Sequence, residues 1–103
     1  MTTAIILFIL FFGLGIIFSL GKGAMLIAGY NTKSDAERAK YNERALTRAM
    51  ATMMFVIAFS FIIDMIGYLR DEAMWNNVSV AVMISAIIFG LIYINTSKKI
   101  KQS

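Results

Sequence analysis

The chain has 103 residues, 59% of them hydrophobic, and carries ten Lys and Arg against six Asp and Glu. A soluble domain is typically about 25% charged, so a chain with only 16% charged residues cannot cover itself with a polar surface. The absence of His and Cys excludes disulfides, thiolate metal sites and the commonest general base. We therefore expect an integral membrane protein that holds no cofactor and no metal.

Three long apolar runs predict three transmembrane helices. Residues 2–21 contain no charge and are long enough, at about 1.5 Å per residue, to cross a hydrocarbon core of about 30 Å. Nothing basic precedes this run, which favours an uncleaved anchor over a secretory signal peptide. Residues 49–69 carry one charge, Asp64, and residues 78–95 carry none. The sequence predicts an all-α integral membrane fold, with residues 1–103 as a single membrane domain.

The distribution of basic residues predicts the orientation of the spans. Nine of the ten Lys and Arg residues lie in the loop at 22–48 or after the third span, and Arg70 alone lies between the second and third spans. Short loops rich in Lys and Arg stay on the cytoplasmic side. We expect the N-terminus outside and the C-terminus inside.

The loop at 22–48 predicts a cytoplasmic helix beginning near Ser34. Ser34 and Glu37 have the spacing of a capping box, and Arg44 and Arg48 follow later, the charge order that a helix dipole favours. No Gly or Pro occurs at 35–65, so we expect this helix to run unbroken into the second span. Because acidic residues are interspersed among the cations, the cations indicate contact with lipid headgroups, and we expect no nucleic-acid partner.

Between the first span and this helix, the residue types indicate a change of direction. Gly21, Gly23 and Gly29 permit backbone angles that other residues avoid, and Asn31 and Thr32 suit turns and helix caps.

Two stretches of this segment carry a resemblance to known proteins. The runs Gly21-Lys22-Gly23 and Ala28-Gly29-Tyr30-Asn31-Thr32, followed by Ser34, Glu37 and Lys40-Tyr41, resemble the signature of small three-helix bacterial membrane proteins of unknown function. The resemblance implies a bacterial plasma membrane protein with the signature after its first helix and two further helices, and it implies no activity.

The chain departs from that signature at three positions: it has Arg38, Asn42 and Thr47 where the family usually has Lys, Asp and often Cys. The turn Gly29-Tyr30-x-Thr32 is also similar to a turn in multi-span immunity proteins that protect producers from their own toxic peptides.

Asp64 is the one ionisable residue inside a predicted span. A carboxylate at the bilayer centre costs about 2.5 to 3.5 kcal/mol on insertion scales, which makes such a residue a candidate site. Helical spacing places Asp64 in one stripe with Met53, Ile57, Ser60 and Tyr68, and the hydroxyls of Ser60 and Tyr68 could bond to it from the turns on either side. We expect this stripe to face protein or water. Asp64 is then a structural hydrogen-bonding point, a residue that recognises a partner, or a group that couples to protons or ions.

Small residues in the first and third spans predict close helix packing. They lie at Gly13, Gly15 and Ser19, and at Ala81, Ser85, Ala86 and Gly90. The faces that they form can pack within the bundle or against another subunit.

These observations favour binding over catalysis. Asp64, Ser60 and Tyr68 include no second titrating partner for acid-base or nucleophilic chemistry, so we expect no enzyme. We expect an accessory or protective protein that binds within the bilayer, either as an immunity factor against a membrane-active toxin or as a subunit of a larger membrane complex. The alternative is an oligomeric transporter or channel component with Asp64 lining the path. The candidate residues are Asp64, Ser60, Tyr68, Gly29, Tyr30, Asn31 and Thr32, and the expected partners are the lipid bilayer, a membrane protein or second copy, and a toxin.

Overall fold

A computed structural model describes residues 1–23, 33–97 and 100 of the chain. Four helices follow one another along it: α1 (Thr2–Ser19), α2 (Asp35–Arg38), α3 (Glu43–Arg70) and α4 (Ala73–Thr96). No β-strand occurs among these residues. The structure thus confirms an all-helical fold.

Three of the helices are long and apolar enough to cross a membrane: α1 with 18 residues, α3 with 28 and α4 with 24. Helix α1 ends slightly before the predicted end of the first span, whereas α3 and α4 begin earlier than the predicted spans at 49–69 and 78–95. At about 1.5 Å per residue α3 is about 42 Å long, which exceeds a hydrocarbon core of about 30 Å. The prediction of three apolar helices is confirmed, and α3 extends beyond its apolar run toward the charged loop.

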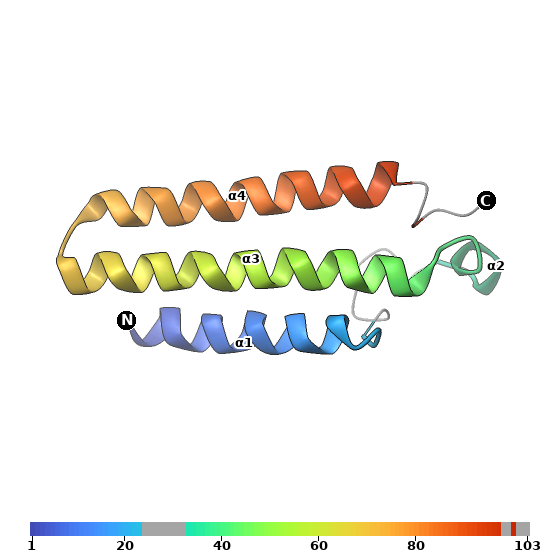
Figure 1. Cartoon of the computed structure of the whole chain (residues 1–103), viewed down its shortest axis with the longest axis horizontal. Coiled ribbons are helices and arrows are strands. Elements are labelled where there is room, and N and C mark those ends of the chain that lie inside the picture. Colours follow the sequence, from blue (N-terminus) through green and yellow to red (C-terminus); the bar gives the residue numbers. More distant parts are fainter. Residues whose placement is uncertain (24–32, 98–99, 101–103) are drawn as a thin grey trace.

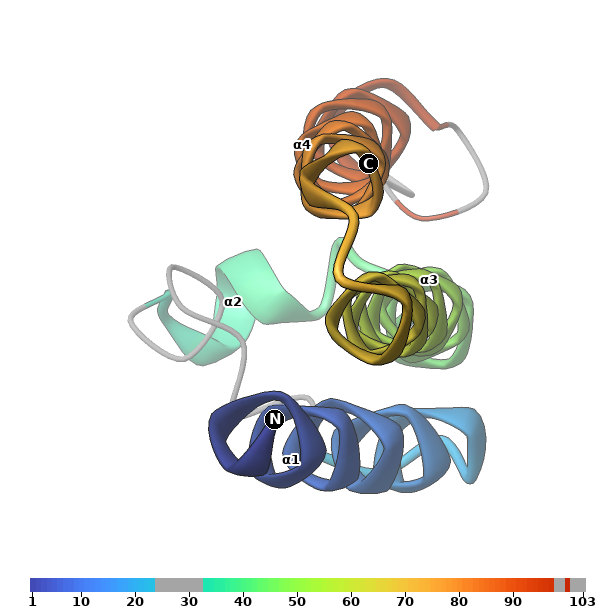
Figure 2. The same ribbon diagram turned by 90° about the vertical axis from the view of Figure 1, so that its left-hand side faces the viewer.

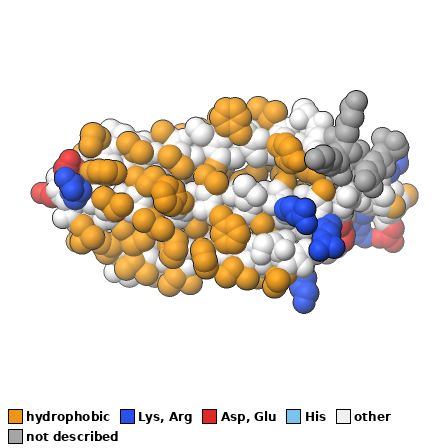
Figure 3. Space-filling model, in the orientation of Figure 1, with side chains coloured by type: hydrophobic (Ala, Val, Ile, Leu, Met, Phe, Trp, Pro, Cys, Tyr) orange, Lys and Arg blue, Asp and Glu red, His pale blue; other side chains and the backbone are white. Residues whose placement is uncertain are grey.

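The three long helices lie in a row with α3 in the middle (Figures 1 and 2). They alternate in direction, so the N-terminus lies beside the turn between α3 and α4, and α2 lies at the opposite end (Figure 1). The buried core follows α3 because only this helix has a neighbour on two sides. The outer faces of α1 and α4 form an apolar belt, and the charged side chains gather at the two ends of the molecule (Figure 3).

Helices α1 and α3 approach closely at Gly15. A Cβ atom at this buried glycine would lie 2.7 Å from Cε1 of Phe55, so the Phe55 ring occupies the space that any larger residue would need. Rings pack on either side: Phe11 stacks on Phe61 with centroids 5.8 Å apart, and Phe12 meets Phe55 edge-on at 5.5 Å. This confirms that Gly15 allows close packing within the bundle. A Cβ at Gly13 would have nothing within 4 Å, so that glycine serves no contact here.

Helices α3 and α4 are joined by a short turn and by packing of small residues. Asp71 ends α3 in the left-handed conformation, with φ 53°, and the backbone N–H of Glu72 donates to the carbonyl oxygen of Gly67 at 3.1 Å. Gly67 faces the Cβ of Trp75, and farther along the hairpin the Met53 side chain packs over Gly90. The two small residues let α4 lie close against α3 along much of its length.

The predicted continuous helix from Ser34 into the second span is wrong. Ser34 does cap α2, its Oγ accepting from the backbone N–H of Glu37 at 3.2 Å, but α2 ends at Arg38. A new helix begins at Glu43, where Oδ1 of Asn42 accepts from the backbone N–H of Ala45 at 3.2 Å. Because an Asn side chain satisfies a free backbone donor at a helix start, Asn42 breaks the helix without Gly or Pro.

Ile100 closes the end of the bundle that carries α2. Its side chain is 0% exposed and packs with Leu46, and its carbonyl oxygen accepts from the backbone N–H of Asn42 at 2.6 Å. The last residue that the structure describes is therefore bound to the start of α3.

Candidate functional site

A cavity of about 600 Å³ lies at the end of the molecule where the chain begins and where α3 turns into α4. All three long helices and the turn contribute to its lining: Met1 and Ala4 of α1 and its cap, Asp64, Met65, Gly67 and Tyr68 of α3, and Asp71, Glu72, Ala73 and Asn76 of the turn and α4. This cavity brings Asp64 and Tyr68, two of the predicted site residues, to one place.

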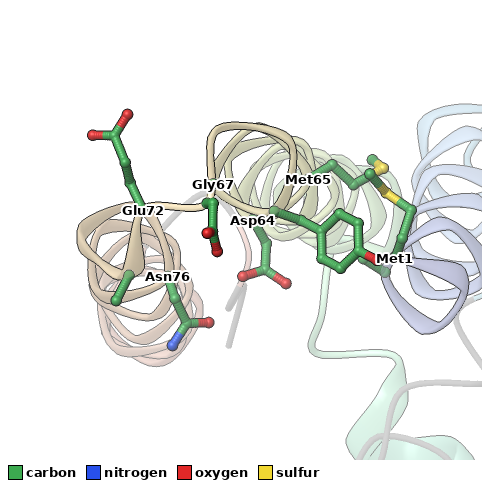
Figure 4. Close-up of a pocket in the computed structure, with 10 residues that line it drawn as sticks. Met1, Asp64, Met65, Gly67, Glu72 and Asn76 are labelled. Atoms are coloured by element: carbon green, nitrogen blue, oxygen red, sulfur yellow. The ribbon is translucent and has the colours of Figure 1, made fainter.

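Asp64 is half-buried, and its carboxylate points into the open space between α3 and α4, toward which Asn76 also points (Figure 4). Within the described part of the chain, the carboxylate has no hydrogen bond and no ion pair. Among the described residues, Nε1 of Trp75 is the only buried side-chain N or O atom that has no hydrogen-bond partner. The oxygens of Asp64 also have no partner there, and since they are not among the buried atoms, they are accessible from the cavity. The carboxylate is available to a group from outside the chain.

Ser60 makes no hydrogen bond to Asp64. Its hydroxyl donates to the carbonyl oxygen of Ile57 at 2.5 Å, and its own carbonyl oxygen accepts from the hydroxyl of Ser79 at 2.7 Å. Both serines are buried, so this second bond joins α3 to α4 in the interior of the bundle. The expected hydrogen bond from Ser60 to the carboxylate is absent because the helix backbone already occupies that hydroxyl.

Tyr68 lines the cavity but is 66% exposed, and no hydrogen bond joins its hydroxyl to Asp64. The stripe that the helical spacing predicts is therefore divided. Its first part, from Met53 through Ile57 to Ser60, is buried against protein, and its last part, Asp64 and Tyr68, opens toward the outside.

The acids of the turn have other roles. Glu72 Oε1 accepts from Nε of Arg70 at 2.8 Å, and its side chain points away from the cavity in Figure 4. Asp71 adopts the left-handed backbone conformation that ends α3. Asp64 is thus distinct among the cavity's acids, since it neither pairs with a cation nor forms the turn.

The other predicted site residues, Gly29, Tyr30, Asn31 and Thr32, lie outside the described residues. Just before them, Gly21 and Gly23 have φ of 77° and 82°, which confirms that the chain turns here with backbone angles suited to glycine.

The cavity offers hydrogen-bond acceptors and a negative charge. Among the residues that the structure describes, no three His, Cys, Asp or Glu side chains lie where they could hold a metal ion. A single carboxylate beside an amide can accept hydrogen bonds or pair with a cation, and both are interactions by which membrane helices recognise one another.

Sequence reasoning missed Asn76 and Met1 as neighbours of Asp64, and Ser79 as the partner of Ser60. A signal for two of these contacts was present. In a tight hairpin, residues at similar distances from the turn lie near one another, and the short polar run at 70–72 marks the turn. Asp64 and Asn76 lie six and four residues from this run, and Ser60 and Ser79 lie ten and seven. Met1 could not be placed in this way because it comes from α1, which is joined to α3 by a long loop.

A search of curated proteins and a search of solved structures each returned no match. A family model does match, over residues 5–98, which include α3, α4 and all of α1 except its first three residues. By that match the chain belongs to the family described as Domain of unknown function (DUF3784).

Proposed function

We propose that the protein is a small integral membrane accessory or protective protein that acts by binding a partner within the bilayer. The observation that carries this proposal is the Asp64 carboxylate, which lies in an apolar helix, opens into a cavity and has no partner among the described residues. An acid in the hydrocarbon region is costly unless it is paired. A cationic or hydroxyl side chain from a neighbouring membrane helix would offset that cost.

The row arrangement of the helices supports the same proposal. Only α3 has neighbours on both sides, so a partner helix can reach the cavity beside α1 or beside α4. Asn76 and Tyr68, both exposed, supply further polar groups at the rim. A partner with one cation near its end and an otherwise apolar surface fits this site.

We further propose that the protein is a multi-pass protein of the bacterial plasma membrane, with its N-terminus outside and its C-terminus inside. The excess of Lys and Arg near α2 supports this orientation through the preference of basic loops for the cytoplasm. The cavity then opens toward the outer face, where a membrane-active toxin would arrive. That placement favours an immunity role over a role at the cytoplasmic face.

Copurification with matched variants tests partner binding. The full-length protein is crosslinked in its native membrane through a photoreactive residue at Asn76, extracted in mild detergent, and compared with Asp64→Leu and with Glu72→Gln. We expect a discrete crosslinked membrane protein whose yield falls at least about tenfold in Asp64→Leu, because a buried charge that loses its partner costs about 2 kcal/mol or more. Glu72→Gln, which changes another acid of the same cavity, should keep the yield. Equal yields from all three proteins would overturn the proposal.

The proposed role as an immunity factor is tested by a separate experiment. A sensitive strain that expresses the protein is challenged with membrane-active peptides, and survival is compared among the wild type, Asp64→Asn and Tyr30→Ala. We expect protection by the wild type and its loss in Asp64→Asn. Equal killing with and without the protein would exclude immunity and leave the role of a subunit in a larger complex.

A second candidate function is an oligomeric transporter or channel with Asp64 lining the path. It is supported by the way Asp64 and Asn76 face one open cavity, since polar groups that face water within a membrane mark ion paths. Ion flux into liposomes that contain the purified protein tests it. Flux that is absent, or that Asp64→Leu leaves unchanged, would exclude this function.

A further inference from the structure

A long groove lies between α3 and α4 and extends from Arg48 and Tyr93 toward the α3–α4 turn, without sharing a lining residue with the Asp64 cavity. Two adjoining cavities of about 560 and 490 Å³ form it, and they share the lining residues Val56, Ala86 and Phe89. On α4 the groove reaches from Tyr93 to Val78, which at 1.5 Å per residue is about 22 Å. Half of a hydrocarbon core of about 30 Å is about 15 Å, so the groove is longer than one leaflet is deep.

Small residues leave space between the two helices for the groove, and large side chains line its edge. Ala49 and Gly90 leave room between the helices, and Met53, only 7% exposed, lies over Gly90 and closes the floor. Phe89 and Tyr93 stand at the α4 side with 71% and 50% of their surface exposed. The result is a largely apolar channel that is open along its length, lined by both helices near Arg48 and, toward Val78, by α4 with Val56 as the one contribution of α3.

The groove has a cation at one end. Arg48 lines it, is exposed, and has no hydrogen bond or ion pair from its guanidinium among the described residues. It directly precedes the uncharged run at 49–63, so it stands where the apolar part of α3 gives way to polar chain. An arginine at that level lies among lipid headgroups. Tyr93 lines the same cavity and adds a hydroxyl donor.

We propose that this groove binds an anionic phospholipid, with the phosphate held by Arg48 and Tyr93 and one acyl chain lying along the channel toward Val78. Charge complementarity identifies the occupant: the mouth offers a cation that has no partner among the described residues, and the lining toward Val78 is apolar apart from Ser85. Thr52 fits this assignment because its hydroxyl already donates to the carbonyl oxygen of Arg48 at 3.2 Å and leaves its methyl group for the chain. Arginine and tyrosine donors with an apolar channel match a phosphate ester that carries a hydrocarbon tail.

A helix would occupy the groove less well. A helix is about 10 Å wide with its side chains and would rest on Phe89 and Tyr93, above the floor that Met53 forms. It would also need an acid at the headgroup level to meet Arg48. The lipid site is independent of the partner proposed at Asp64, because Arg48 stands at the opposite end of α3 and no residue lines both cavities.

Native mass spectrometry of the full-length protein tests the inference. The protein is released from micelles that contain equal amounts of phosphatidylglycerol and phosphatidylcholine with identical acyl chains. We expect phosphatidylglycerol to be retained preferentially, and Arg48→Gln to reduce that preference about fivefold, which corresponds to about 1 kcal/mol for one basic contact with an anionic lipid. The matched control is Arg44→Gln, which removes an exposed cation one turn away that does not line the groove.

A second pair of variants tests the channel. Val56→Phe, at the one α3 position that lines both cavities, should reduce retention of both lipids, whereas Ile84→Phe, at an exposed α4 position outside the groove, should not. Circular dichroism and gel filtration verify that the variants fold. A photoreactive residue at Val56 should crosslink to lipid in membranes. Equal retention of the two lipids by the wild type, equal effects of Arg48→Gln and Arg44→Gln, or a crosslink from Val56 to a second copy would overturn the inference.

Discussion

At the scale of single residues, two glycines of the same helix have opposite surroundings. Gly15 is buried against the Phe55 ring, which lies where a Cβ would have to go, whereas Gly13 faces open space. Because the two glycines lie two positions apart in the same helix, the same substitution at each position provides a matched comparison. Close approach of α1 to α3 depends on one of them and not on the other.

We predict that Gly15→Ala destabilises the protein by about 1 to 3 kcal/mol, the usual range for overpacking, because a Cβ 2.7 Å from Cε1 of Phe55 forces the helices apart. Gly13→Ala should be neutral or stabilise by up to about 1 kcal/mol, since alanine favours the helix and meets no atom. Unfolding by SDS in mixed micelles, followed through the fluorescence of the one Trp, gives both values. A loss of stability in Gly13→Ala as large as that in Gly15→Ala would contradict the packing described here.

The candidate site illustrates what single residues in a sequence can reveal. Asp64 could be identified because it interrupts an apolar run. A charged side chain in a transmembrane helix is energetically costly, so its presence indicates a structural or functional role. Its neighbours could not be identified in the same way. Asn76 is an ordinary polar residue until the hairpin register brings it opposite α3, and Ser60 was assigned to the wrong partner because the helix carbonyl of Ile57 competes for its hydroxyl.

At the scale of elements, the apolar runs predicted three helices well because hydrophobic length is a strong signal. The break between α2 and α3 was missed because it depends on a cap. Residues 39–42 contain neither Gly nor Pro, yet the Asn42 side chain offers the backbone an alternative to a continuous helix. The turn is held from outside as well, because the backbone N–H of Asn42 donates to the carbonyl oxygen of Ile100.

We predict that Asn42→Ala weakens the first turn of α3 by about 1 kcal/mol, the usual cost of removing an Asn cap, because the N–H of Ala45 loses its acceptor. Hydrogen exchange of the Ala45 amide measures the effect and should become about fivefold faster. Asn42→Asp keeps a cap oxygen and should preserve the protection. If both variants exchange like the wild type, the cap does not hold the start of α3.

At the scale of the whole molecule, the protein is an elongated body of 51 × 22 × 19 Å whose middle is apolar and whose ends are charged (Figure 3). Its long axis exceeds the roughly 40 to 45 Å of a bilayer with headgroups, so both ends can reach water. The two ends differ in charge. Arg70, Asp71 and Glu72 form the turn beside the N-terminus, whereas Arg44 and Arg48 stand near the other end with α2.

This asymmetry predicts one orientation, and because the chain has no native Cys, single cysteines can test it. Cys introduced at Asn76 lies beside the α3–α4 turn and should react with an impermeant thiol reagent in intact cells. Cys at Ser34, the cap of α2, should react only after the membrane is opened, because basic segments are retained in the cytoplasm. Cys at Ser103 should behave like Cys at Ser34, since three crossings place the C-terminus on the side of the first loop. Labelling of the Ser34 position in intact cells would reverse the orientation and place the Asp64 cavity at the cytoplasmic face, where a toxin arriving from outside could not reach it directly.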